Sequence, residues 1–182
     1  MRARPPFWHP GLPALVLLLS ALCTAPPALA AELLTRIKAA FLFNVAKFVE
    51  WPDPGSSLDI CVLSDADFTR TAAKELAEKS VGNRPVVLRE IEPGQTQNCA
   101  MVYFGADLEP QAIAETLSQI QGRAVLSVGD SPELMELGGI MRLRQENGKL
   151  RFQVAMAPLE ASGLRFSSKL LRLADVVPDG TP

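Results

Sequence analysis

Cys99-Ala100-Met101-Val102-Tyr103-Phe104 is a run without a charged side chain or an alternation of polar and apolar residues. An unbroken apolar run of this length is typical of a central strand that helices cover on both faces. Helical patterns lie before and after it, at 66–78 and 108–121. The run therefore predicts the middle strand of a sheet in an α/β domain.

Further strands and helices are predicted on both sides of this run. Strands are expected at Leu58–Leu63, Pro85–Glu90 and Ala124–Val128. A first helix is expected over Glu32–Glu50, where apolar residues recur at steps of three and four and Trp51-Pro52 ends the pattern. A short helix is expected over Glu133–Leu137, and two more near the C-terminus, at Pro158–Ala161 and Ser167–Ala174.

A hairpin is predicted where Ile140–Gln145 and Leu150–Val154 flank Glu146-Asn147-Gly148-Lys149. Asn-Gly between alternating segments is the strongest short hairpin signal. We expect this C-terminal β-hairpin at one edge of the sheet, with one apolar and one polar face. The fold predicted is a three-layer αβα domain with a mixed, mostly parallel sheet.

Met1–Ala30 has the pattern of a cleavable signal peptide. Arg2 and Arg4 precede the apolar stretch Leu12–Cys23, and Ala28-Leu29-Ala30 supplies the small residues of a cleavage site. We expect an exported, soluble mature chain, residues 31–182, that forms one domain. Cleavage of the signal peptide removes two arginines and no acidic residue, so the formal net charge of the chain changes from −2 to −4. This charge does not favour nucleic acid as a partner.

Two cysteines, Cys61 and Cys99, remain in the predicted mature chain. An even number in an exported protein favours a disulfide, and the alternative is a pair of buried thiols. The single histidine, His9, lies in the predicted signal peptide. Catalytic triads that use histidine, and ordinary zinc or copper sites, are therefore not expected.

A cleft for a ligand or partner is predicted beyond the carboxyl ends of the parallel strands. Ser64 and Asp65 follow the first strand, and Gly129, Asp130 and Ser131 follow the fourth, each just before a helix. In the alternative interpretation these residues only cap the helices, with Asp130 or Ser131 as N-cap and Pro132 as the first helical residue.

A second candidate region is a surface for a protein partner. Phe43 and Trp51 belong to a dense group of aromatic residues that is either core or interface. Arg142, Arg144 and Arg151 share the polar face of the hairpin, which either binds an acidic partner or is simply solvated.

Catalysis has little support in this sequence. The candidate acids are Asp65, Asp130, Glu133 and Glu136, and no two of them stand at a spacing that indicates acid–base work. Glycine-rich phosphate-binding motifs are absent from the sequence. We expect no enzyme, no metal and no cofactor.

Several segments together resemble the YfiR family of periplasmic proteins. Ile37–Pro52 (IKAAFLFNVAKFVEWP) is similar to the family's opening helix, and Leu58–Leu63 to its first strand. The resemblance continues through its later signatures and its closing segment, in Val128–Pro132, Gly138–Ile140, Asn147–Phe152 and Ala161–Leu171. Cys61 and Cys99 fall where one of the family's cysteine pairs lies.

This resemblance implies a repressor. Such a protein binds the periplasmic sensory part of an inner-membrane diguanylate cyclase, lowers cyclic di-GMP and restrains biofilm formation. It also implies an outer-membrane lipoprotein as a second partner, and a homodimer. The alternatives are a small-molecule-binding sensor module that signals to a membrane kinase or transporter, and, with least support, a hydrolase that uses carboxylates.

Overall fold

The predicted central run forms the middle of one mixed sheet in the computed structural model, which describes residues 27–63 and 66–177. The strand order across the sheet is β10-β8-β7-β6-β5-β2-β4-β3. The pairs from β4 to β7 (β4-β2-β5-β6-β7) are all parallel. The strands are β2 Leu58–Leu63, β3 Ser80–Val81, β4 Arg84–Glu90, β5 Met101–Phe104, β6 Leu126–Gly129, β7 Met141–Glu146, β8 Lys149–Ala155 and β10 Asp175–Val177.

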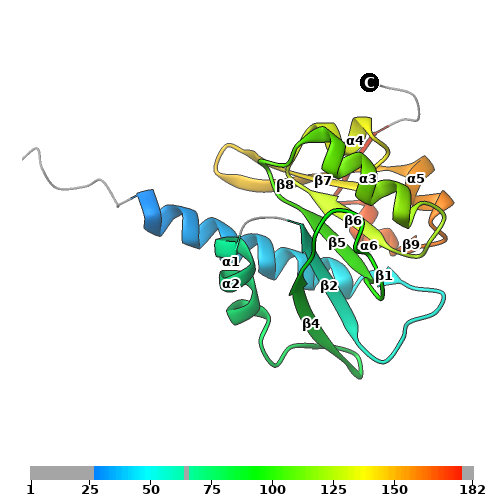
Figure 1. Cartoon of the computed structure of the whole chain (residues 1–182), viewed down its shortest axis with the longest axis horizontal. Helices are drawn as coiled ribbons and strands as arrows, with labels where there is room; N and C mark the ends of the chain where they lie inside the picture. Colours follow the sequence, from blue (N-terminus) through cyan, green and yellow to red (C-terminus); the bar gives the residue numbers. More distant parts are fainter. Residues whose placement is uncertain (1–26, 64–65, 178–182) are drawn as a thin grey trace, which may run out of the picture.

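Helices cover both faces of this sheet, so the predicted three-layer αβα class is confirmed. The helices are α1 Pro27–Ala46, α2 Ala66–Leu76, α3 Pro110–Ile120, α4 Glu133–Glu136, α5 Met156–Ala161 and α6 Ser168–Leu171. On one face, Leu42 of α1 and Phe68 of α2 pack with Ile60 and Tyr103. On the other face, Ile113 and Leu117 of α3 pack with Val102 and Phe104. Figure 1 shows α3 and α4 on one side of the sheet and α1 crossing the other.

The first helix ends earlier than the sequence pattern predicts. It stops at Ala46, and Val49–Glu50 forms a short strand, β1, that pairs antiparallel with β9, Arg165–Phe166. Val49 lies directly opposite Phe166 in this pair, so the last residues of the predicted helix form strand hydrogen bonds with the C-terminal segment and not helical ones. The expectation of a helix through Glu50 is therefore wrong at its end.

The hairpin does not lie at the edge of the sheet. β10 pairs in parallel with β8, in register Asp175 to Gln153 and Val177 to Ala155. The helix predicted over Ser167–Ala174 is correspondingly shorter, since α6 ends at Leu171 and leaves the following residues free to form β10. The antiparallel pairing of β7 with β8 is confirmed.

The apolar pattern of the first helix predicts a core-facing stripe of Leu34, Ile37, Phe41, Val45 and Phe48, and of these only Val45 is fully buried. Ala39, Leu42, Val45 and Ala46 are the buried residues. Ile37 and Phe48, both in the predicted stripe, are 45% and 38% exposed. No helix in the described part of the chain is long and apolar enough to cross a membrane.

Candidate functional site

A cleft of about 590 Å³ lies beyond the carboxyl ends of β5 and β6. Among the described residues predicted for a cleft here, Asp130 lines it, and Gly129 and Ser131 do not. Side chains from α1 and α2 form its walls, with Tyr103 and Asp130 from the sheet side. Of the five residues predicted for this cleft, Ser64 and Asp65 lie outside the described residues. Gly129 ends β6, and Asp130 and Ser131 follow it.

Asp130 is already occupied by contacts within the chain. Its carboxylate accepts a hydrogen bond from Lys38 Nζ on α1 at 2.7 Å and another from the hydroxyl of Tyr103 on β5. The Lys38 and Asp130 side chains are only 17% and 13% exposed. Asp130 thus connects α1 to the ends of two central strands. These internal contacts compete with any contact between the Asp130 carboxylate and a molecule bound in the cleft.

Gly129 and Ser131 also have local structural roles. A Cβ atom at Gly129 would lie 2.5 Å from the Phe104 carbonyl oxygen, so the close approach of β6 to β5 requires glycine here. Ser131 is buried, and its hydroxyl donates a hydrogen bond to the Glu133 carboxylate. That hydrogen bond is the main cause that lowers the pKa of Glu133 below its usual value.

For α4, the expected cap by the side chain of Asp130 or Ser131 is wrong, and the same expectation for Ser64 and Asp65 falls outside the described residues. The N-cap of α4 is Pro132, and no side-chain hydrogen bond caps the helix. Among residues 27–63 and 66–177, no group of three histidine, cysteine or acidic side chains is placed to hold a metal ion.

The residues predicted for a partner surface lie in two separate regions, the aromatic residues at and after α1 and the arginines on the β7–β8 hairpin. Trp51 is buried, with its ring nitrogen donating to the Ala100 carbonyl at 3.2 Å. Phe43 is half-buried, with the Lys47 ammonium 4.0 Å from its ring centre. Arg142, Arg144 and Arg151 lie on β7 and β8, on the hairpin face opposite the core. The structure therefore does not bring the aromatic and basic candidates together.

An apolar face on α1 is the surface feature that sequence reasoning missed. Leu33 and Ile37 are 58% and 45% exposed, one helical turn apart. Phe41 and Phe48 follow further along the chain and line an apolar groove of about 240 Å³. Leu173, which is 70% exposed, lines the same groove. We call Leu33, Ile37, Phe41, Phe48 and Leu173 the α1 face. The first turns of α1 project beyond the sheet (Figure 1).

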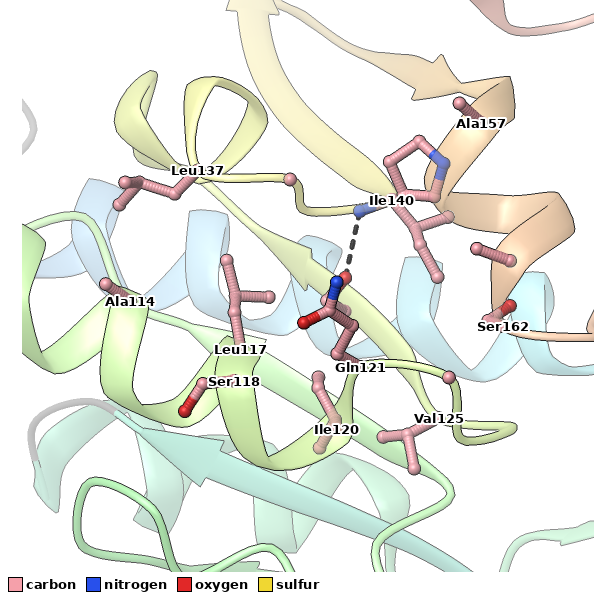
Figure 2. A pocket seen from close by; sticks show the side chains of 15 residues that line it. Ala114, Leu117, Ser118, Ile120, Gln121, Val125, Leu137, Ile140, Ala157 and Ser162 are labelled. Atoms are coloured by element: carbon pink, nitrogen blue, oxygen red, sulfur yellow. Dashed lines mark hydrogen bonds between the residues drawn. The ribbon is translucent and has the colours of Figure 1, made fainter.

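A second groove with a largely apolar lining lies between α3 and α5 (Figure 2). Its volume is about 450 Å³, and no charged side chain lines it. Ser127 on its floor accepts a hydrogen bond from the Ile140 amide at 2.9 Å. Of the predicted site residues that the structure describes, none lines this groove.

Cys61 and Cys99 form a disulfide, as the exported-protein interpretation favoured. Their Cα atoms lie 5.8 Å apart, and both residues are buried. The bond joins β2 to the residue that precedes β5 by two positions, so it crosses between the two central strands.

Comparison with known proteins points to one family. The family model described as YfiR/HmsC-like matches residues 35–175. A solved structure, described as a conserved domain protein from Vibrio cholerae O1 biovar El Tor strain N16961, superposes with a TM-score of 0.46 at 12% identity. That match covers 78% of this chain and 59% of the Vibrio chain, so this protein spans somewhat more than half the length of its structural neighbour.

Proposed function

The chain belongs to the YfiR/HmsC-like family of periplasmic regulators, and we propose that it represses an inner-membrane diguanylate cyclase by direct contact. The family is regulatory and not catalytic. In the proposed mechanism, binding to the periplasmic sensory part of the cyclase holds the enzyme inactive, which lowers cyclic di-GMP and restrains biofilm formation.

The observation that carries this proposal is the α1 face. Monomeric proteins seldom expose large side chains as a contiguous apolar patch without using it for binding. Here Leu33 and Ile37 stand on a helix that projects from the domain, next to a groove lined by Phe41, Phe48 and Leu173. A helix or strand of the cyclase sensory domain would bury this patch and gain free energy from it.

The remaining parts of the proposal follow the family. Residues 1–30 act as a cleavable signal peptide that delivers the mature chain to the periplasm, and 1–26 lie outside the described residues. An outer-membrane lipoprotein releases the repression by binding this protein. A homodimer is the proposed assembly state.

Replacing Ile37 with glutamate is expected to reduce the amount of cyclase captured by the tagged protein about tenfold, as loss of an interface hot spot does. The reason is that a carboxylate at the centre of the α1 face must be desolvated on binding. The measurement is co-purification of the tagged protein with detergent-solubilised inner membrane, followed by quantitation of the cyclase.

Leu137→Glu is the matched control for this experiment. Leu137 is 40% exposed, close to the 45% of Ile37, but it follows α4 and lines the groove of Figure 2. We expect this variant to capture the cyclase as the wild type does. Equal capture by Ile37→Glu and the wild type would count against the α1 face, and dimer formation that depends on Ile37 would assign the face to a second copy instead.

A second candidate function is a sensor module that binds a small molecule and signals to a membrane kinase or transporter. The cleft of about 590 Å³ between α1 and α2 favours it, since ligands of α/β domains bind at this edge of the sheet. In that case a small molecule should raise the melting temperature of the wild type, and Thr71→Trp, which fills the cleft, should abolish the effect. A screen of periplasmic metabolites without any such shift would remove this candidate.

A further inference from the structure

The hairpin presents one face that consists almost entirely of charged and polar side chains. The register pairs Arg142 with Gln153, Arg144 with Arg151, and Glu146 with Lys149. These positions alternate with the buried residues Met141, Leu143, Phe152 and Val154, so they share the opposite face. We call the four cations of this face, Arg142, Arg144, Lys149 and Arg151, the basic face.

The charges on this face are only partly balanced within the chain, where Glu133 of α4 acts electrostatically on Arg142. Arg144 and Arg151 stand directly opposite each other across the ladder, an arrangement that is destabilising for like charges. Arg144 pairs with Asp175 of β10 and lies 3.9 Å from Glu146. In the described part of the chain, Arg142, Lys149 and Arg151 form no ion pair within 4.0 Å.

Two of these side chains are partly fixed by packing. The Nε atoms of Arg142 and Arg144 are buried and have no hydrogen-bond partner among residues 27–63 and 66–177. Because these Nε atoms are buried, a partner can reach only the Nη groups of the two side chains. Packing around Nε also limits the freedom of the guanidinium groups, so less entropy is lost when they bind.

We propose that the basic face binds an extended acidic segment of a partner protein, with carboxylates on alternate residues. Arg142 and Arg144 are two residues apart on β7, so their Cα atoms are spaced by roughly 7 Å. Alternate side chains of an extended segment have the same spacing. The two Nη groups of Arg142 can donate in parallel to the oxygens of one carboxylate, whereas Arg144 already donates its Nη2 to Asp175 and can offer its Nη1 to a second carboxylate.

The charge of the surroundings favours spaced carboxylates over a continuous polyanion. Glu146 and Asp175 lie among the cations, and both are more than half exposed. They would repel the closely spaced phosphates of a nucleic acid or an anionic membrane, whereas an acidic segment can place its carboxylates between them. The predicted mature chain has a net charge of −4, so the basic face is a local cluster of positive charge on an acidic protein. Electrostatic attraction would direct an acidic partner to this face.

Fluorescence anisotropy with a labelled peptide of about five Glu-Thr repeats tests this inference, since that peptide has the required spacing. At low ionic strength we expect the purified protein to bind it and to bind a Lys-Thr peptide of the same length much more weakly. Lys149→Gln/Arg151→Gln should lower the affinity for the Glu-Thr peptide about tenfold and weaken its dependence on salt. Both side chains are exposed, so the fold is kept.

Arg165→Gln is the control, because Arg165 is also exposed but lies on β9, away from the hairpin. It should bind the peptide as the wild type does. Equal binding by the double variant and the wild type would overturn the proposal, as would tighter binding to phosphatidylglycerol vesicles than to the Glu-Thr peptide. The assay contains no cyclase, so its result is independent of the repression proposed above.

Discussion

Replacing Cys61 and Cys99 together with alanine is expected to lower the free energy of unfolding by about 4 kcal/mol. The two residues are 38 positions apart, so the bond removes the loop-closure entropy of a long segment from the unfolded chain. Both side chains are buried between β2 and the start of β5, and their loss also leaves a small cavity. Urea denaturation of the oxidised protein and of the double variant measures the difference.

Reduction of the wild type serves as the control for this prediction. With a reductant present, its midpoint in urea should fall close to that of the double variant. Thiol titration of the oxidised mature protein in denaturant should find no free thiol. A double variant that unfolds within about 1 kcal/mol of the oxidised wild type would show that the bond contributes little to stability.

Replacing Asp130 with alanine is expected to cost about 3 kcal/mol of stability, the lower end of the range for breaking a buried ion pair. The variant leaves the Lys38 ammonium, 17% exposed, without its carboxylate 2.7 Å away. It also removes the hydrogen bond that the Tyr103 hydroxyl donates to Asp130, and Tyr103 is 1% exposed. The measurement is again the free energy of unfolding from urea denaturation.

Asp107→Ala is the matched control, because Asp107 lines the same cleft but is exposed to solvent. Its effect should stay within about 0.5 kcal/mol. Adding Lys38→Met to Asp130→Ala should restore part of the loss, since no uncompensated charge then remains beside the sheet. An Asp130→Ala protein as stable as the Asp107→Ala protein would contradict the role given to this ion pair.

The central part of the fold could be predicted because its signals are local. An unbroken apolar run marks β5, and Asn147-Gly148 between alternating segments marks the β7–β8 hairpin. The disulfide could be anticipated from the cysteine count and the export signal. Each of these inferences uses residues that are adjacent in the sequence or a property of the whole chain.

Features that depend on distant contacts could not be predicted. β10 is three residues long and exists because β8 offers it an edge, so nothing within Asp175–Val177 marks it as a strand. Lys38 and Asp130 are 92 positions apart, and no pattern connects them. The helix α1 is apolar on several sides, so periodicity alone did not show that Leu42 faces the sheet while Ile37 remains exposed.

Cyclic di-GMP, measured in a strain that lacks this gene and expresses the cognate membrane cyclase, tests the proposed repression most directly. We predict that deletion raises cyclic di-GMP, that the wild-type gene restores the low level, and that the Ile37→Glu gene does not. The Leu137→Glu gene should restore it. Unchanged cyclic di-GMP after deletion, with the cyclase present in the membrane, would contradict the account.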